Sequence, residues 1–408
     1  MKTQAFLIFN ARKIYFFGAL IGLLYGLSPQ ISIWLFNSKL PGVSSFSIYF
    51  LICWVLWLII CCPLNCRLIS RIEVNESRLR VGIILAAAIF VVTQCVYYGD
   101  FTKAFIVAYT ERTGVEQSDG INFLLYPITT AFTSIVLLFT IHLYARPDRI
   151  NIFNLASLIV SVLIFSALGS RNLLLWSLSA LLALFLSRMR YRTILLLVVG
   201  IYIFAVLFAY ARNAGLVAYL SSSIDQLTYE LHWEYFDPVI HEFGSSYRTF
   251  NLIESDSNAA QYLINHAPYG QFTSFFINLL PSFMKPSGFI SFTNFISLSY
   301  AVPGEGIGSS PMTEAYLSSM ASLASLSIVL ALAFWPGYYF SRCSALSFFT
   351  YVLAVAVCFN VWRIGSAEIL KMLMSSVVTL FILAKVCGFR VLLFKRNFPQ
   401  ITCESTSR

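Results

Sequence analysis

Long apolar runs alternate with short polar turns along most of the chain. Ten of these runs are typical of membrane-crossing helices, since roughly 20 apolar residues span the hydrocarbon layer. The turns between them carry the Gly, Pro, Asn and charged residues that end helices. The predicted spans cover residues 14–36, 43–62, 81–99, 121–145, 151–169, 173–186, 193–210, 315–340, 345–362 and 369–388. The pattern therefore predicts an all-α polytopic membrane protein with about 10 transmembrane helices.

One polar stretch, between the seventh and eighth predicted spans, is much longer than the others. It divides the chain into helices 1–7 over residues 1–211, a long loop over 212–314, helices 8–10 over 315–388 and a basic tail over 389–408. Three of the four histidines lie in the loop. Apolar residues at helical spacing predict short helices within it. We expect the spans to form a scaffold, and the loop, with residues at helix ends, to carry the chemistry.

Composition excludes a soluble protein. Hydrophobic residues make up 58% of the 408 residues, charged residues only 11%, and the mean hydropathy is +0.77. So few charges cannot cover the surface of a soluble protein of this size. The net charge of +9 is therefore interpreted first as a signal of membrane topology. No nucleic-acid partner is expected.

The distribution of charge predicts the orientation. An even number of spans places both termini on one side of the membrane. If that side is the cytoplasm, most of the 27 Lys and Arg residues lie inside and most of the 18 acidic residues lie outside. This asymmetry follows the positive-inside rule. We therefore predict cytoplasmic termini and an outward-facing long loop.

Several classes of chemistry have no signature in the sequence. There is no phosphate-binding Walker motif, no Rossmann glycine run, no HExxH metalloprotease motif and no Asp-x-Asp motif. Cys61, Cys62 and Cys66 form the densest cysteine cluster, but no His or further Cys pair joins them. They are interpreted as small apolar residues at a helix end. No metal and no cofactor is expected.

Outward-facing arginines are the first candidate site. Arg171, Arg212 and Arg363 lie at ends of predicted spans, and Arg248 lies in the loop. Guanidinium groups hold phosphate or pyrophosphate without a metal. Several of them around one outer cavity would suit a lipid pyrophosphate whose tail lies between helices. The alternative for each arginine is contact with lipid headgroups at the membrane surface.

A second candidate is the amphipathic part of the loop. Residues 272–280 place Phe and Leu at helical spacing, and Pro281 ends the pattern. This segment would form one wall of a groove with Gly270 and Lys285 at its ends. The alternative is a helix lying on the membrane surface.

The third candidate is the end of the loop. Ser310 and Pro311 match the N-cap and first position of a helix, which places Glu314 in or just after its first turn. An acid there is stabilised by the helix dipole. The alternative is a carboxylate that accepts a proton from a sugar hydroxyl. His232, His241 and His266 are further candidate bases, although a lone loop histidine is more often structural.

These segments resemble the Wzy-type repeat-unit polymerases of bacterial O-antigen synthesis. The matching features are Gly169-Ser170-Arg171 between two spans, a long outward loop, Tyr269-Gly270 followed by Pro281 and Lys285-Pro286, and Gly304 to Tyr316 with Glu314-Ala315-Tyr316. The resemblance covers roughly residues 150–320, and its order and spacing carry more weight than any single motif.

The resemblance implies a lipid-dependent glycosyltransferase of the GT-C class. It would polymerise undecaprenyl-pyrophosphate-linked oligosaccharide repeat units into O-antigen, or a related surface polysaccharide, at the periplasmic face of the inner membrane. A chain-length regulator and a flippase are the implied protein partners. Arg171, Arg212 and Arg248 would hold the leaving pyrophosphate. Glu314 or a loop histidine would activate the acceptor hydroxyl, and among the loop histidines we assign this role to His241.

The complete expected site joins this implication to the candidates from the residues themselves. It comprises the catalytic Glu314 and His241, the pyrophosphate-binding Arg171, Arg212, Arg248 and Arg363, and the groove residues Tyr269, Gly270, Lys285 and Tyr316.

Two other functions stay open on the sequence. An O-antigen ligase also has a long outward loop, but a histidine-centred motif is expected late in it, and no histidine follows His266 there. A lipid-linked glycan flippase or other transporter is expected to show internal repeats and charges within spans. The sequence shows no repeat.

Overall fold

The computed structural model describes most of the chain outside the long loop. The described residues are 3–61, 67–106, 122–145, 152–168, 171–214, 236–239, 242–256, 276–277, 280, 284–287, 289, 310–318, 320–335 and 344–393.

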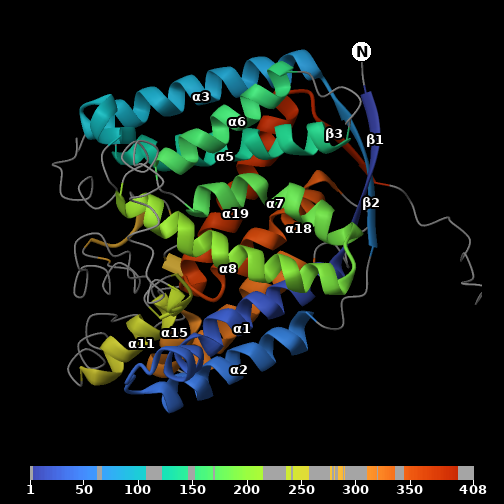
Figure 1. The fold of residues 1–408 in the computed structure, drawn as a ribbon. Coiled ribbons are helices and arrows are strands. Elements are labelled where there is room, and N and C mark those ends of the chain that lie inside the picture. Colours follow the sequence, from blue (N-terminus) through green and yellow to red (C-terminus); the bar gives the residue numbers. More distant parts are fainter. Residues whose placement is uncertain are drawn as a thin grey trace, which may run out of the picture.

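The chain folds into a bundle whose helices run back and forth in roughly one direction, from side to side in Figure 1. Five helices are long and apolar enough to cross a membrane, and five shorter apolar helices lie among them. Each predicted span corresponds to one of these stretches. In chain order the bundle contains α1 (Ala11–Phe36), α2 (Val43–Cys61), α3 (Glu76–Tyr98), α5 (Asn122–Ala145), α6 (Ile152–Ala167), α7 (Arg171–Arg188), α8 (Tyr191–Ala214), α15 (Pro311–Ser318), α16 (Met320–Phe334), α18 (Ser344–Asn360) and α19 (Ser366–Val386). Shorter elements are η1 (Thr102–Ile106), η5 (Glu242–Gly244) and α11 (Ser245–Ser255).

A three-stranded antiparallel sheet closes one end of the bundle and was not expected from the sequence. Strand β2 (Arg67–Val74) lies between β1 (Thr3–Asn10) and β3 (Arg390–Leu393). Thr3 pairs with Val74 and Asn10 with Arg67, and Ile72 pairs with Val391. The sheet joins the N-terminal segment, the α2–α3 connection and the segment after α19, so we call this the sheet end and the opposite end the loop end.

The sheet is stabilised by apolar side chains on its face toward the bundle. Leu7, Phe9, Ile72 and Val74 are buried against the helix ends. Residues two apart point to the same face of a strand, so these apolar side chains share one face. The Phe9 ring packs 5.6 Å from the Phe348 ring on α18. The all-α prediction is therefore right for the bundle but omits this sheet. Strands β1 and β3 show apolar runs without the alternation that would have predicted a strand.

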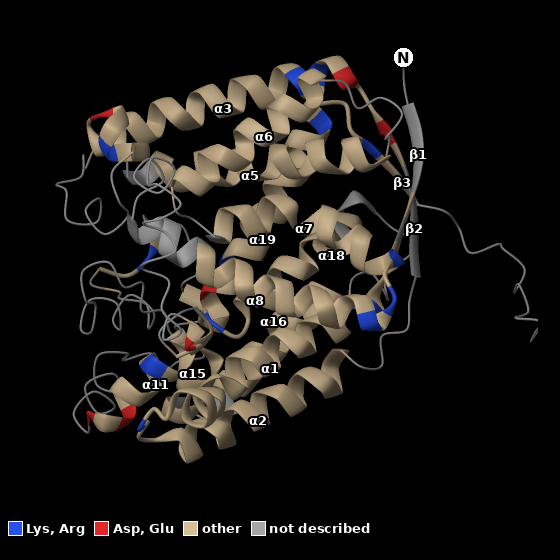
Figure 2. Cartoon of the chain, in the orientation of Figure 1, with Lys and Arg blue, Asp and Glu red and all other residues tan. Residues whose placement is uncertain are grey.

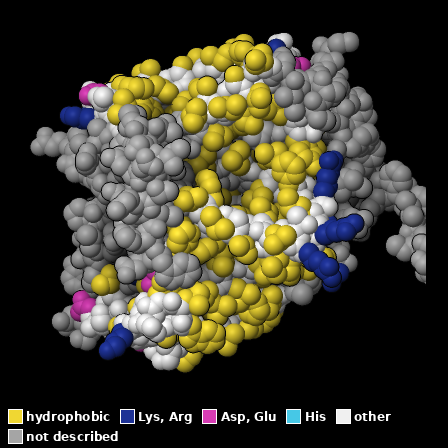
Figure 3. All heavy atoms as spheres, viewed as in Figure 1, with side chains coloured by type: hydrophobic (Ala, Val, Ile, Leu, Met, Phe, Trp, Pro, Cys, Tyr) yellow, Lys and Arg dark blue, Asp and Glu magenta, His cyan; other side chains and the backbone are white. Residues whose placement is uncertain are grey.

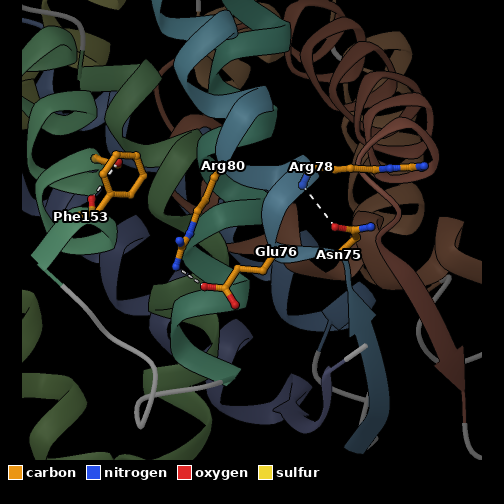
Figure 4. A network of polar contacts seen from close by, with 6 residues as sticks. Asn75, Glu76, Arg78, Arg80 and Phe153 are labelled. Carbon is orange, nitrogen blue, oxygen red and sulfur yellow. Dashed lines mark hydrogen bonds and ion pairs between the residues drawn. The ribbon is translucent and has the colours of Figure 1, made fainter. Parts of the chain in front are cut away.

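Polar contacts at the start of α3 fix it against α6 (Figure 4). The Arg78 backbone N–H donates to Asn75 Oδ1 at 3.3 Å, which caps the helix. Glu76 and Arg80 form an ion pair one turn apart. The Arg80 guanidinium also lies 5.7 Å from the centre of the Phe153 ring on α6. A charged side chain thus joins two helices at the sheet end.

Helix α18 lies at the centre of the bundle. Its residues from Phe348 to Asn360 are all buried, and so are Val361 and Trp362 beyond it. It packs against α1, α7, α16 and α19. A helix that is apolar on every side is expected to be surrounded by other helices.

Glycines on α1 let α18 and α2 approach closely. A Cβ atom placed on Gly22 would lie 2.6 Å from the Trp362 indole, and one on Gly18 would collide with Trp57. The Trp362 indole N–H donates to the Gly18 carbonyl oxygen at 3.2 Å. Small residues spaced four apart allow such close packing between membrane helices.

This packing predicts that Gly22→Ala destabilises the protein. The added methyl group would overlap the Trp362 indole, and overpacking of a core costs about 1–3 kcal/mol. Thermal unfolding of the purified protein in detergent, followed by tryptophan fluorescence, should show a midpoint several degrees lower. Gly200→Ala on α8 is the matched control, because no atom lies within 4 Å of its added Cβ. Equal midpoints for the two variants would contradict the close approach.

Candidate functional site at the loop end

An apolar cavity of about 520 Å³ runs along α7. Figure 3 shows a hollow bordered by hydrophobic side chains on this face of the molecule. Residues of α6, α7 and α8 form most of its wall, and parts of α1 and α18 close it. Its lining comprises Tyr25, Val162, Ser166, Leu174, Leu175, Leu178, Leu181, Leu182, Phe185, Leu197, Ile201, Phe204, Ala205, Phe243, Phe359, Asn360 and Arg363. Such a lining favours a hydrocarbon chain.

The loop end of the cavity is polar. Asn360, the last residue of α18, and Arg363 in the turn after it line the cavity there. The Arg363 Nη1 atom donates to Asn172 Oδ1 at 3.2 Å, so the guanidinium is held beside the first turn of α7. A guanidinium at the end of an apolar cavity suits an amphiphile with an anionic head.

The turn that carries Arg363 is held from two sides. Ser246 Oγ on α11 donates to the Trp362 carbonyl oxygen. The backbone N–H groups of Arg363 and Ile364 donate to the Asn360 carbonyl oxygen at 3.0 and 2.9 Å. The turn then leads directly into α19 through Gly365. Arg363 therefore lies on a fixed backbone.

Glu314 supports the same turn. Its carboxylate accepts the Ser366 backbone N–H at 3.1 Å and the Ser366 hydroxyl at 2.9 Å. The Glu314 side chain is only 4% exposed. Because Ser366 is the first residue of α19, the carboxylate binds the positive end of that helix. The acid thus stabilises the N-terminus of α19 in addition to lying in the first turn of α15.

The predicted cap at the start of α15 is confirmed. The Thr313 backbone N–H donates to Ser310 Oγ at 3.3 Å, and Pro311 is the first residue of the helix. The Glu314 N–H donates to the Ser310 carbonyl oxygen at 2.9 Å. This local geometry aims Glu314 toward α19.

The predicted arginines have different positions. Arg171 is the first residue of α7, directly before the Asn172 that Arg363 contacts. Arg212 lies in the last turn of α8. The Arg248 guanidinium on α11 donates to the Val239 carbonyl oxygen, which ties two parts of the loop together. The fold therefore places the Arg363 guanidinium beside Asn172, the residue that follows Arg171.

Of the groove residues, Tyr316 and Lys285 are described. The Tyr316 ring packs 5.2 Å from the Phe250 ring and 5.7 Å from the Tyr49 ring. The Lys285 ammonium lies 5.4 Å from the centre of the Phe289 ring. Burial lowers the pKa of Lys285, and the positive charge of Lys371 lowers it further, while Glu368 acts in the opposite direction. The predicted Tyr269, Gly270 and His241, and also His232 and His266, lie outside the described residues.

Sequence reasoning missed a buried acid that anchors the loop. Asp237 is 6% exposed, and its carboxylate accepts the Ser32 hydroxyl at 2.9 Å and the Ser38 hydroxyl at 3.1 Å. It also accepts the Val239 backbone N–H at 2.9 Å, as in an Asx turn. The Asp-Pro pair at residues 237–238 was the available signal for a turn. Asn172 and Asn360 were also missed. The only available signal was for Asn172, which follows Arg171 directly in the sequence.

Metal binding has no candidate in the described part of the chain. Within those ranges, no group of three or more His, Cys, Asp or Glu side chains is arranged to hold a metal ion. The chemical groups available at this site are a guanidinium, carboxamides, a hydroxyl and a carboxylate.

The contact between Glu314 and Ser366 predicts different effects for two substitutions. Glu314→Leu leaves the buried Ser366 N–H without its acceptor and should cost about 1–3 kcal/mol. Glu314→Gln keeps a carbonyl oxygen in reach and should cost less. Thermal unfolding in detergent would measure both. If Glu314→Leu were as stable as the unchanged protein, the carboxylate would not be supporting α19.

Known proteins provide no further assignment. No family model, no curated protein and no solved structure matches the chain. The function is therefore inferred from the residues and geometry of the chain itself.

Proposed function

We propose that the protein polymerises undecaprenyl-pyrophosphate-linked oligosaccharide repeat units into O-antigen or a related surface polysaccharide. The observation that carries this proposal is the apolar cavity along α7 that ends at Arg363. A cavity of this kind accepts an isoprenoid chain and brings its pyrophosphate to a guanidinium. The resemblance of residues 150–320 to Wzy-type polymerases supports the same substrate class.

The proposed topology is ten crossings with both termini in the cytoplasm. Among the described residues, five helices are long and apolar enough to cross a membrane, and the five shorter apolar helices would supply the other crossings. Lys and Arg residues cluster at the sheet end, near the starts of α3 and α8 (Figure 2). By the positive-inside rule this end faces the cytoplasm, and the loop end faces the periplasm. Arg363 then lies where a periplasmic pyrophosphate would be.

The proposed reaction transfers the growing glycan from one lipid to the next repeat unit. The bond between the anomeric carbon and the pyrophosphate oxygen breaks, and a new bond forms to a hydroxyl oxygen of the acceptor sugar. The leaving group is undecaprenyl pyrophosphate, whose negative charge Arg363, Arg171, Arg212 and Arg248 would stabilise. The proton of the acceptor hydroxyl passes to a base, for which Glu314 and His241 are the candidates.

The first test of this function uses a bacterial strain that carries the gene. Deletion should leave lipopolysaccharide with a single repeat unit, and the unchanged gene should restore the ladder of longer chains. A strain without any repeat on its lipid core would instead favour a ligase or a flippase. A normal ladder after deletion would contradict the proposal.

Arg363→Ala should fail to restore the ladder although the protein is present in the membrane. The substitution removes the guanidinium at the polar end of the cavity but leaves the apolar lining. The matched control is Lys103→Ala, which removes an exposed positive charge at the same end, in η1 and away from the cavity. A full ladder with Arg363→Ala would remove this residue from the mechanism.

Glu314→Gln separates a base from a structural acid. Glutamine keeps an acceptor for Ser366 but cannot take up a proton. If Glu314 is the base, the stable Glu314→Gln protein should lose the ladder by at least about 100-fold. If the carboxylate acts only through the α18–α19 turn, the ladder should persist, and His241 becomes the base to test.

A further inference from the structure

The sheet end of the α7 cavity carries a second cationic group. Leu181 and Phe185 line the cavity, and Arg188 follows Phe185 by three residues. Residues three, four and seven apart lie on the same face of a helix. Arg188 therefore lies on the face of α7 that borders the cavity, one turn beyond its apolar lining.

The Arg188 side chain is held by an aromatic ring at this position. Its guanidinium lies 4.9 Å from the centre of the Tyr144 ring on α5. The Tyr144 ring in turn packs edge-on at 5.6 Å from the Phe185 ring. The exposed guanidinium therefore directly adjoins the apolar lining. Within the described residues, the buried Tyr144 hydroxyl has no hydrogen-bond partner.

Two more arginines surround this position. Arg190 and Arg192 lie at the turn between α7 and α8, and both are exposed, as is Arg188. No acidic side chain of the described residues forms an ion pair with these three arginines. Lys and Arg side chains line the same edge of the hollow in Figure 3. The positive charge here is therefore not compensated by the described part of the protein.

The turn itself is rigidly held. Lys13 Nζ donates to the Ser187 and Met189 carbonyl oxygens at 3.1 and 2.6 Å. The Asn10 backbone N–H donates to Ser187 Oγ at 2.8 Å. Lys13 closes the C-terminus of α7, so Arg188, Arg190 and Arg192 are left to face outward.

We propose that this end of the cavity binds an anionic phospholipid of the cytoplasmic leaflet. The headgroup phosphate contacts Arg188, Arg190 and Arg192, and one acyl chain lies against Leu181 and Phe185. The cationic groups at the two ends are separated by the 18 residues of α7, or about 27 Å at 1.5 Å per residue. This is close to the roughly 30 Å of the hydrocarbon layer, so the two ends serve opposite leaflets. The inference uses the orientation proposed above but not the polymerase activity.

A phospholipid fits this position better than a soluble phosphate. The anionic lipids of the cytoplasmic leaflet attract Lys and Arg at the membrane surface. Only a lipid also covers the apolar residues next to Arg188, and burial of its chain adds to the headgroup contact. The site would give the inner half of the cavity a resident lipid, distinct from the substrate at Arg363.

Native mass spectrometry of the purified full chain tests this site. The protein, released from detergent with either phosphatidylglycerol or phosphatidylcholine added, should retain phosphatidylglycerol preferentially. Arg188→Ala should reduce that preference about fivefold, as expected for one basic residue at an anionic surface. Leu181→Trp should reduce retention of the lipid without any change in charge, because the indole fills the space of the acyl chain.

Arg78→Ala is the matched control for charge. Arg78 is exposed at the sheet end on α3, and only its backbone N–H takes part in the contact with Asn75 (Figure 4). It should keep the phosphatidylglycerol preference of the unchanged protein. The proposal is overturned if Arg188→Ala keeps the full preference, if Arg78→Ala loses as much of it, or if excess inorganic phosphate displaces the lipid. None of these outcomes depends on the glycan ladder, so the lipid site and the polymerase stand or fall separately.

Discussion

The packing of Trp362 against α1 is the interaction on which the candidate site depends. Its indole fills the space beside Gly22 and donates a hydrogen bond to the Gly18 carbonyl oxygen. This contact fixes the end of α18 relative to α1, and Arg363 is the next residue along the chain. A buried aromatic side chain thus determines where an exposed guanidinium can lie. The contacts of Ser246 with Trp362 and of Glu314 with Ser366 hold the remaining sides of the same turn.

The cavity along α7 depends on this arrangement, because the turn that Trp362 holds carries Arg363 at the loop end of the cavity. Its apolar wall runs along α7. Arg363, in the turn after α18, lies at the loop end of this wall, and Arg188 of α7 lies at the sheet end. Both are held by a neighbouring side chain, Asn172 for the first and Tyr144 for the second. The proposed functions of the two ends follow from this polarity, since a membrane amphiphile places its charged head at one surface and its chain in the interior.

The long loop is tied to the bundle where it approaches α1. Asp237 accepts hydrogen bonds from Ser32 and Ser38, and Ser28 donates to the Phe243 carbonyl oxygen at 3.1 Å. Without these contacts a buried carboxylate would lack partners, which is costly in an apolar environment. The anchors position α11, whose Ser246 reaches the Arg363 turn. The described part of the loop therefore packs against the bundle beside the candidate site.

The hydropathy pattern alone located the apolar helices, because a bilayer requires that each crossing segment satisfy its own backbone hydrogen bonds. It also located the cap at Ser310 and Pro311, because capping depends on residues within one turn of each other. The pairing of Asn172 with Arg363 and of Glu314 with Ser366 could not be read from the sequence, since these residues lie far apart along the chain. The sheet was missed because its pairing joins segments from both ends of the chain, and β1 and β3 lack an alternating apolar pattern. Sequence by itself determined where the apolar helices lie and where α15 begins. Only the tertiary structure decided which of them meet, because that depends on how closely Trp362 and the glycines of α1 allow the helices to pack.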